Sequence, residues 1–144
     1  ASIGVVTLYA TPDLKRKLKS IQNDLFDLGA DLCVPISENN NGRLRVSTSQ
    51  IETLEAEIDE MNNILKPLNS FILPGGCKSA TFLHLARTIC RRAERSVVSL
   101  RSKEEINDNT LIYLNRLSDW LFVASRVENQ ENSTEVLWSP GKNK

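Results

Sequence analysis

The segment from His84 to Arg95 reads HLARTICRRAER and contains four arginines, one glutamate and no lysine. His84, Arg87, Arg91 and Glu94 recur every three or four residues, so on a helix they form one ridge beside the apolar residues. Guanidinium groups are planar, permanently charged, and bind phosphate or carboxylate through paired hydrogen bonds. Because a surface that serves solubility alone usually includes lysine as well, this arginine set predicts an anion-binding site.

A second polar ridge is predicted further along, where Asn115, Asp119, Phe122 and Arg126 follow the same spacing and Arg116 lies beside them. Two alternatives stay open. Any one arginine is better explained as a solvated surface residue, in an ion pair worth under about 1 kcal/mol, and only the set favours an anion site. Asn115 and Asp119 are equally well explained by a hydrogen bond to each other or by bridging two helices.

Other residue types that perform catalysis are scarce. The three cysteines, Cys33, Cys77 and Cys90, lie far apart without a CxxC pair, and His84 is the single histidine. This pattern argues against a disulfide framework or a zinc site and is typical of a reducing compartment. Cys90 falls among apolar positions and is predicted to lie in the core, and a lone histidine is more often structural than catalytic.

The loop Phe71–Gly76, FILPGG, places an apolar triplet before a proline and two glycines. Such a loop exposes Phe71 unless another segment covers it, and the glycines let the backbone approach a ligand closely. In the polar C-terminal tail, Val136, Leu137 and Trp138 are predicted to dock as a short anchor. Phe71 is therefore a candidate ligand-contacting residue.

The elements that must hold these residues are predicted to be helices. Apolar residues recur every three or four positions in four segments, which predicts four packed helices. These segments are Leu14–Leu28, Ile51–Leu65, Leu83–Leu100 and Leu111–Ser125. Thr11-Pro12-Asp13 is predicted to start the first of them, Pro67 to end the second and Asn109 to cap the last. The polar stretch Ile36–Val46 is predicted to be an exposed loop or short hairpin.

The chain start also follows a helical pattern. Ile3, Val6 and Ala10 have helical spacing but no cap or loop in front of them, which predicts residues ahead of Ala1. The fold predicted for residues 1–144 is therefore one all-α domain, an up-and-down five-helix bundle whose first helix is truncated.

Composition argues against several classes of protein. The charges of eighteen basic and eighteen acidic residues cancel, and only 6% of residues are aromatic. Nucleic acid is therefore not predicted as a partner. A nucleic-acid-binding helix built on RRAER is kept as the weakest alternative. No apolar run reaches the roughly 20 residues that span a bilayer, so no membrane partner is predicted. The G-x-x-x-x-G-K-[ST] and G-x-G-x-x-G motifs are absent, so the familiar nucleotide-binding folds are not supported.

Three motifs in order carry a resemblance to a known family. FILPGG, LHLARTICRRAER and YLNRLSDWLFVASR closely resemble the PGG loop, the AR-x-x-x-RRAER helix and the YLNRLSD helix of the PduO-type ATP:cob(I)alamin adenosyltransferases. IQNDLFDLGADL is similar to an earlier helix of that family, so the resemblance runs from about Ala1 to Trp138. It implies a homotrimer of five-helix bundles that binds ATP between adjacent subunits, with the corrinoid above it.

The reaction that this resemblance implies transfers the 5′-deoxyadenosyl group of ATP to the Co(I) of a reduced corrinoid, cob(I)alamin. The products are adenosylcobalamin and triphosphate, and Mg²⁺ accompanies ATP. The reduced cobalt is itself the nucleophile, which agrees with the lack of a predicted serine, cysteine or histidine nucleophile.

The resemblance also implies roles for particular residues. Those implied to bind ATP are Arg91, Arg92, Glu94, Arg95 and Asn115, with Arg91 as the main phosphate contact. Arg87 is implied to pair with an aspartate of the neighbouring subunit, Asp119 to support the active site, and Phe71 to crowd the lower face of the corrinoid. The metal ligands stay unassigned.

Two family segments would lie ahead of Ala1: TGD-x-G-x-T, which wraps the triphosphate, and VDELN, which supplies the aspartate for Arg87. We therefore expect this N-terminal ATP-loop segment to precede the chain. The alternative is a non-catalytic bundle that binds or delivers the corrinoid. The resemblance further suggests delivery of the product to an adenosylcobalamin-dependent enzyme, in the cytoplasm or, in a eukaryote, the mitochondrial matrix.

Overall fold

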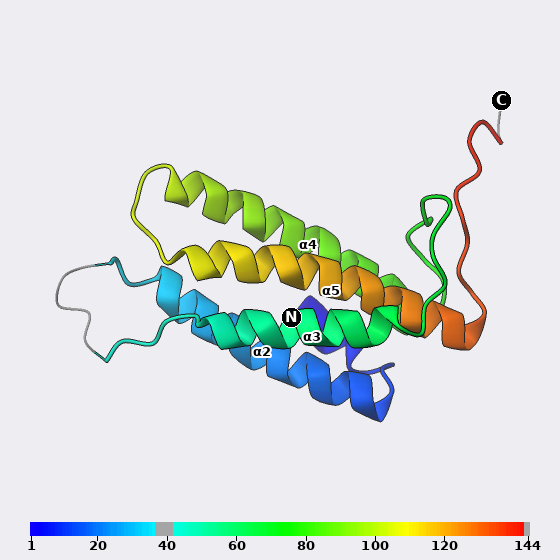
Figure 1. Ribbon diagram of the computed structural model, residues 1–144, viewed down its shortest axis with the longest axis horizontal. Helices are drawn as coiled ribbons and strands as arrows, with labels where there is room; N and C mark the ends of the chain where they lie inside the picture. The colour runs from blue at the N-terminus through cyan, green and yellow to red at the C-terminus, as the bar shows by residue number, and fades with distance from the viewer. Residues whose placement is uncertain (37–41, 143–144) are drawn as a thin grey trace.

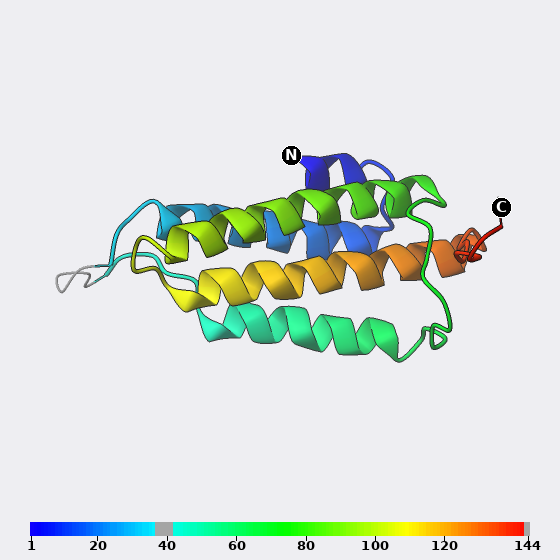
Figure 2. The same cartoon turned by 90° about the horizontal axis from the view of Figure 1, so that it is seen from above.

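Five α-helices occur in the part of the chain that the computed structural model describes, residues 1–36 and 42–142. They are α1 (Ser2–Val6), α2 (Pro12–Leu32), α3 (Thr48–Asn62), α4 (Lys78–Arg101) and α5 (Asp108–Asn132). Figures 1 and 2 show the four long helices running side by side, with the short α1 against α2 and α4. The predicted all-α five-helix bundle is confirmed.

Helix α2 begins where the sequence predicted it. Thr11 Oγ1 accepts a hydrogen bond from Leu14 N at 3.4 Å, and Pro12 occupies the first turn, where its missing N–H costs nothing. Asp13 lies at the positive end of the helix dipole. These three residues set the first turn, and the apolar stripe that follows is buried against the bundle.

Two helix boundaries differ from the prediction. Helix α3 ends at Asn62, ahead of Pro67. Helix α5 is capped by Asn107 rather than Asn109, because Asn107 Oδ1 accepts a hydrogen bond from Asn109 N at 3.2 Å. Asn109 Nδ2 instead donates to the Val46 carbonyl at 3.1 Å, so Asn109 connects α5 to the preceding loop.

Helix α5 is the central element, packed against α3 and α4 and also touching α2. Trp120 and Tyr113 are fully buried, and burying a large apolar side chain stabilises the fold by roughly 1.5–3 kcal/mol. Trp120 Nε1 donates to Glu57 on α3 at 2.7 Å. Ser118 is buried as well, and its Oγ has no hydrogen-bond partner among the described residues. Because α5 buries side chains toward several neighbours, a polar group such as Trp120 Nε1 takes its partner from one of those neighbours.

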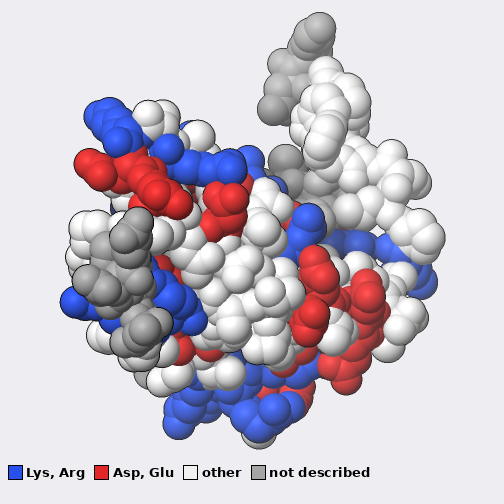
Figure 3. All heavy atoms as spheres, turned by 60° about the vertical axis from the view of Figure 1, so that its left-hand side comes forward, with Lys and Arg blue, Asp and Glu red and all other residues white. Residues whose placement is uncertain are grey.

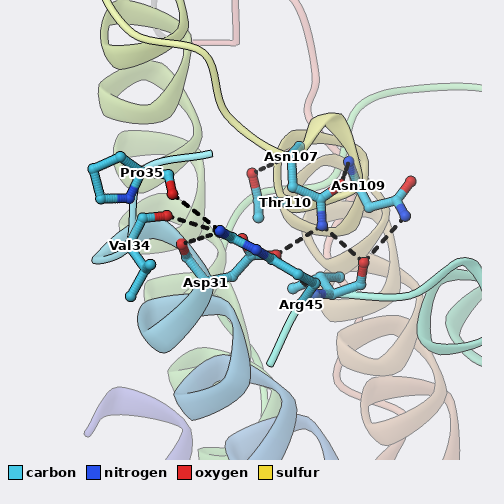
Figure 4. Close-up of polar contacts among 8 residues, drawn as sticks. Asp31, Val34, Pro35, Arg45, Asn107, Asn109 and Thr110 are labelled. Carbon is cyan, nitrogen blue, oxygen red and sulfur yellow. Dashed lines mark hydrogen bonds and ion pairs between the residues drawn. The ribbon is translucent and has the colours of Figure 1, made fainter. Parts of the chain in front are cut away.

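A polar network around the buried Asp31 joins the end of α2 to the loop before α3 (Figure 4). Arg45 Nη1 donates to Asp31 Oδ1 at 2.6 Å and to the carbonyls of Asp31 and Val34, each at 2.8 Å. Its Nη2 donates to the Pro35 carbonyl at 3.2 Å. The predicted exposed loop is therefore partly wrong, because Arg45 is bound to α2; residues 37–41 lie outside the described residues.

The same network holds the start of α5. Asp31 Oδ2 accepts hydrogen bonds from Val46 N and from Asn107 Nδ2, each at 2.7 Å. Asn107 Nδ2 also donates to the Val46 carbonyl at 2.9 Å, and Val46 itself is buried. One carboxylate thus fixes three segments at this end of the bundle.

The surface carries charges of both signs. Figure 3 shows lysine and arginine side chains interspersed with aspartate and glutamate around an uncharged central area. This distribution agrees with the formal net charge of zero. Among the described residues, no helix is both long enough and apolar enough to cross a membrane.

Candidate functional site

Glu94 of α4 joins two of the residues predicted to bind ATP. Its Oε2 accepts a hydrogen bond from Arg91 Nη1 and its Oε1 accepts one from Asn115 Nδ2 on α5, both at 2.8 Å. The Glu94 side chain is 13% exposed, whereas that of Arg91 is 47% exposed. The carboxylate is therefore held between the two helices and orients a cation and an amide near the surface.

Arg92 and Arg95 are exposed beside this group. Arg95 Nη1 donates to the Arg91 carbonyl at 3.3 Å. Within the described part of the chain, the Arg91 side chain uses only Nη1 for a hydrogen bond. One helix thus presents three guanidinium groups against a single carboxylate, and this arrangement can bind a polyanion through charge-assisted hydrogen bonds.

The other two residues of the α4 ridge pack against Phe122 of α5. The guanidinium carbon of Arg87 lies 5.3 Å from the Phe122 ring centroid, and the His84 ring lies edge-on to it at 6.4 Å. His84 Nε2 and Arg87 Nε are buried and have no hydrogen-bond partner among the described residues. A cation over an aromatic face gains about 0.5–2 kcal/mol, so Phe122 orients Arg87 without satisfying its Nε–H.

Asp119 faces a different neighbour from Asn115. Asp119 Oδ2 accepts a hydrogen bond from Arg116 Nη1 at 3.0 Å. Arg116 Nε lies 3.3 Å from Glu55 Oε1 on α3, within ion-pair distance but without hydrogen-bond geometry. Asn115 therefore lies with the α4 arginines and Asp119 with an ion-pair network toward α3, and the alternative in which they bond each other is not observed.

Cys90 and His84 of α4 are both buried, and burial shifts the pKa of each. Burial raises the pKa of the Cys90 thiol to about 12, and the Glu94 carboxylate adds to this effect. The thiol donates a hydrogen bond to the Leu114 carbonyl at 3.3 Å. Burial, together with the charge of Arg87, lowers the pKa of His84. Cys90 therefore stays a thiol and His84 stays neutral near pH 7, and the predicted core position of Cys90 is confirmed.

Phe71 projects from the loop between α3 and α4 and is 77% exposed. Its ring centroid lies 5.9 Å from that of Trp138, and its carbonyl accepts a hydrogen bond from Trp138 N at 2.7 Å. The predicted docking of the C-terminal tail is thus confirmed, with this loop as the docking surface. The loop leads into the start of α4, and Arg91 follows roughly three to four helical turns later, so the structure does not bring Phe71 together with the arginines.

Arg126 does not join the ridge that the sequence predicted for it. Its Nη2 donates to the Lys66 carbonyl at 2.8 Å and its Nε to Glu135 Oε1 at 3.2 Å. Arg126 therefore connects the loop after α3 to the C-terminal tail. The spacing along α5 could not show this, because both partners lie outside the helix.

Asn129 was not predicted as a site residue. Its Oδ1 accepts a hydrogen bond from Cys77 N at 3.0 Å, and its Nδ2 donates to the Gly75 carbonyl at 2.9 Å. A nearby buried pair, Ser79 and Glu128, also joins α4 to α5, and burial raises the pKa of Glu128. The only available sequence signal was a run of polar residues at the end of α5, which looks the same as an exposed helix end.

Metal-binding side chains are not gathered anywhere in the described ranges. No group of three or more His, Cys, Asp or Glu residues is placed there to hold a metal ion. The groups gathered between α4 and α5 are the Arg91 guanidinium, the Glu94 carboxylate and the Asn115 amide, with Arg92 and Arg95 exposed beside them.

Comparison with known proteins finds relatives over almost the whole chain. The family model described as cobalamin adenosyltransferase matches residues 1–128. A corrinoid adenosyltransferase of Mycobacterium tuberculosis is 46% identical over 146 residues, covering 98% of this chain and 75% of that protein. One of Bacillus subtilis is 48% identical over 117 residues, covering 81% of this chain and 59% of that protein.

Solved structures show the same bundle. A variant PduO-type ATP:corrinoid adenosyltransferase from Lactobacillus reuteri, complexed with cobalamin and ATP, matches with a TM-score of 0.88 at 35% identity. The match covers 95% of this chain and 78% of that chain. A second variant, complexed with ATP, matches with the same TM-score and covers 96% of this chain.

Proposed function

We propose that this chain, which belongs to the cobalamin adenosyltransferase family, transfers the 5′-deoxyadenosyl group of ATP to the Co(I) of a reduced corrinoid. The products are adenosylcobalamin and triphosphate. The names of its relatives and the cobalamin and ATP bound by a structural neighbour support this assignment.

The Glu94 bridge between Arg91 and Asn115 is the observation that carries the proposal. It fixes a half-exposed guanidinium and an amide between α4 and α5, with Arg92 and Arg95 beside them. A triphosphate chain needs several cations in fixed positions, and the guanidinium fork matches phosphate oxygens. We assign Arg91 as the main phosphate contact and the other four residues as the rest of the ATP site.

The reaction balances without a protein nucleophile. Co(I) supplies the electron pair of the new cobalt–C5′ bond and becomes formally Co(III), while the C5′–O bond breaks and its electrons stay on the triphosphate. The arginines stabilise the charge that develops on this leaving group. Cys90 and His84 agree with this scheme, because burial keeps both uncharged and neither is needed.

Phe71 is proposed to face the corrinoid. Its exposed ring is apolar and lies at the end of the bundle where α4 begins. An apolar group beneath the cobalt excludes water and a lower ligand, which makes reduction to Co(I) easier. Phe71 therefore supports formation of the nucleophile, whereas the arginines support departure of the triphosphate.

Mg²⁺ enters the proposal as a companion of ATP. The described residues contain no group of three or more His, Cys, Asp or Glu side chains for a metal ion, so we assign no protein ligand to it. Oxygen atoms of phosphate and water are the ligands that Mg²⁺ usually takes in nucleotide sites.

A homotrimer with active sites between subunits is part of the same proposal. Leu85 and Ile89 on α4 and Ile112 on α5 are exposed near the arginines, and neighbouring exposed aliphatic residues fit a contact with a second copy. The unpaired Nε–H of Arg87 fits a carboxylate from that copy, and Asp119 supports the site from the α3 side. We place the protein in the cytoplasm, where it passes its product to an adenosylcobalamin-dependent enzyme.

The test is to mix the protein with ATP, Mg²⁺ and chemically reduced cobalamin in the dark. We expect the Co(I) spectrum to convert to that of a light-sensitive alkylated corrinoid, with one triphosphate released per corrinoid. Binding of corrinoid without triphosphate release would identify the non-catalytic binding bundle instead. Failure to bind corrinoid at all would refute both functions.

A further inference from the structure

The loop that carries Phe71 is held by the end of α5 and by the segment that follows α5. We propose that Asn129 and residues 134–138 are positioning residues that fix Phe71 for the corrinoid and leave the ATP site unaffected. This inference rests on the proposed function, because it assigns Phe71 to the corrinoid.

Asn129 uses both ends of its amide to hold the loop. It is 1% exposed; its Oδ1 accepts a hydrogen bond from Cys77 N, and its Nδ2 donates to the Gly75 carbonyl. Thr134 Oγ1 donates to Asn129 Oδ1 at 2.8 Å and accepts from Cys77 N at 3.1 Å. The Asn129 amide therefore cannot turn without breaking contacts to the loop and to the tail.

Gly76 lets the loop pass directly over this amide. Its φ is +109°, a conformation that favours glycine, and a Cβ added there would lie 2.0 Å from Asn129 Oδ1. The close approach leaves no room for another residue at this position. Gly76 and Asn129 thus form one matched contact at the end of the FILPGG loop.

The tail pairs with the other end of the loop. Ser133, with φ of 53°, turns the chain after α5, and Ile72 and Leu137 then form an antiparallel bridge. Trp138 N donates to the Phe71 carbonyl, and the two rings contact each other. Because the Phe71 side chain is largely exposed, these backbone contacts and the contact with the Trp138 ring set its position.

Fixing Phe71 matters because its proposed effect depends on its distance from the cobalt. A displacement of about 1 Å in an active site can lower a rate by on the order of 100-fold. Arg91 lies roughly three to four turns along α4 from the loop. Loosening the loop should therefore change corrinoid kinetics and leave ATP binding as it was.

The test compares Asn129→Ala with Asn132→Ala, a matched asparagine on α5 whose Nδ2 donates to the Glu128 carbonyl of its own helix. We expect Asn129→Ala to raise the KM for corrinoid about tenfold, with ATP affinity unchanged, since the misplaced ring fits the corrinoid less well. The Leu73 amide, which donates to the Val136 carbonyl at 2.9 Å, should exchange its hydrogen faster in Asn129→Ala and at the wild-type rate in Asn132→Ala.

A second pair of variants covers the case in which Asn129→Ala fails to fold. Trp138→Pro removes the N–H that binds the Phe71 carbonyl, at an exposed position outside the helices, and Trp138→Phe restores both the N–H and a ring. Corrinoid KM should rise in the first variant and recover in the second. An unchanged corrinoid KM, or equal losses for corrinoid and ATP, would overturn the inference. Hydrogen exchange needs no turnover, so it distinguishes this failure from failure of the proposed function.

Discussion

Arg45 and Arg91 each pair with an acidic residue, but their surroundings differ. The Arg45 side chain is 22% exposed, and its two terminal nitrogens bind Asp31 and three backbone carbonyls. The Arg91 side chain is 47% exposed and donates one hydrogen bond, to Glu94. An N–H that already has a protein acceptor is not free to bind an anion. Arg45, whose terminal nitrogens bind four protein acceptors, therefore stabilises the fold, and Arg91, which has one such acceptor among the described residues, remains able to bind a ligand.

The largest expected effect is a loss of stability on replacing Asp31, the acidic partner of Arg45. Asp31→Ala removes the acceptor of Arg45, Val46 N and Asn107, and loss of a buried partner costs about 3–5 kcal/mol of unfolding free energy. Urea unfolding measures it. The control is Asp13→Ala, a carboxylate that is 65% exposed in its ion pair with Arg16, where we expect less than about 1 kcal/mol. Equal losses in the two variants would show that the Asp31–Arg45 pair stabilises the fold no more than an exposed ion pair does.

A smaller effect, on binding rather than folding, is expected at Arg91. Arg91→Ala should weaken ATP affinity by about 1–3 kcal/mol, because a charge-assisted phosphate contact is lost, while unfolding free energy changes by less than about 1 kcal/mol. Arg16 offers a matched control, since it forms an i,i+3 ion pair of 2.7 Å on α2 and Arg91 forms one of 2.8 Å on α4. Isothermal titration with ATP measures both variants. Unchanged affinity in Arg91→Ala would exclude Arg91 from the ATP site.

The smallest effect is expected at His84, the single histidine. Its pKa is lowered in the folded state by burial and by Arg87, so the unfolded chain binds the proton more readily. Stability should therefore be full above the unfolded pKa of about 6.5 and fall as the pH drops through the lower folded pKa. Urea unfolding at several pH values between 7 and 5, for the wild type and His84→Gln, measures the difference. A pH dependence that is identical in the two proteins would show that His84 does not titrate on unfolding.

Local patterns predicted much of the fold and part of the site. The apolar stripes placed the four long helices, and the spacing of Arg87, Arg91 and Glu94 predicted their common ridge on α4. The link from Glu94 to Asn115 was not predictable in the same way, because it depends on how α4 and α5 are aligned. Arg126 shows the limit most clearly, since its spacing on α5 matched a ridge while its partners lie in the loop after α3 and in the C-terminal tail.

The amino-acid sequence by itself determined the four long helices, the Thr11-Pro12 start of α2 and the residue types along each helix, because these depend on neighbours within one or two turns. The tertiary structure decided which polar groups have hydrogen-bond partners within the protein. Asn107 meets Asp31 across 76 positions, and Asn129 meets Gly75 across 54. Such contacts depend on how the helices pack, so only the folded chain separates Arg45, which binds several protein acceptors, from Arg91, whose side chain binds Glu94 alone among the described residues.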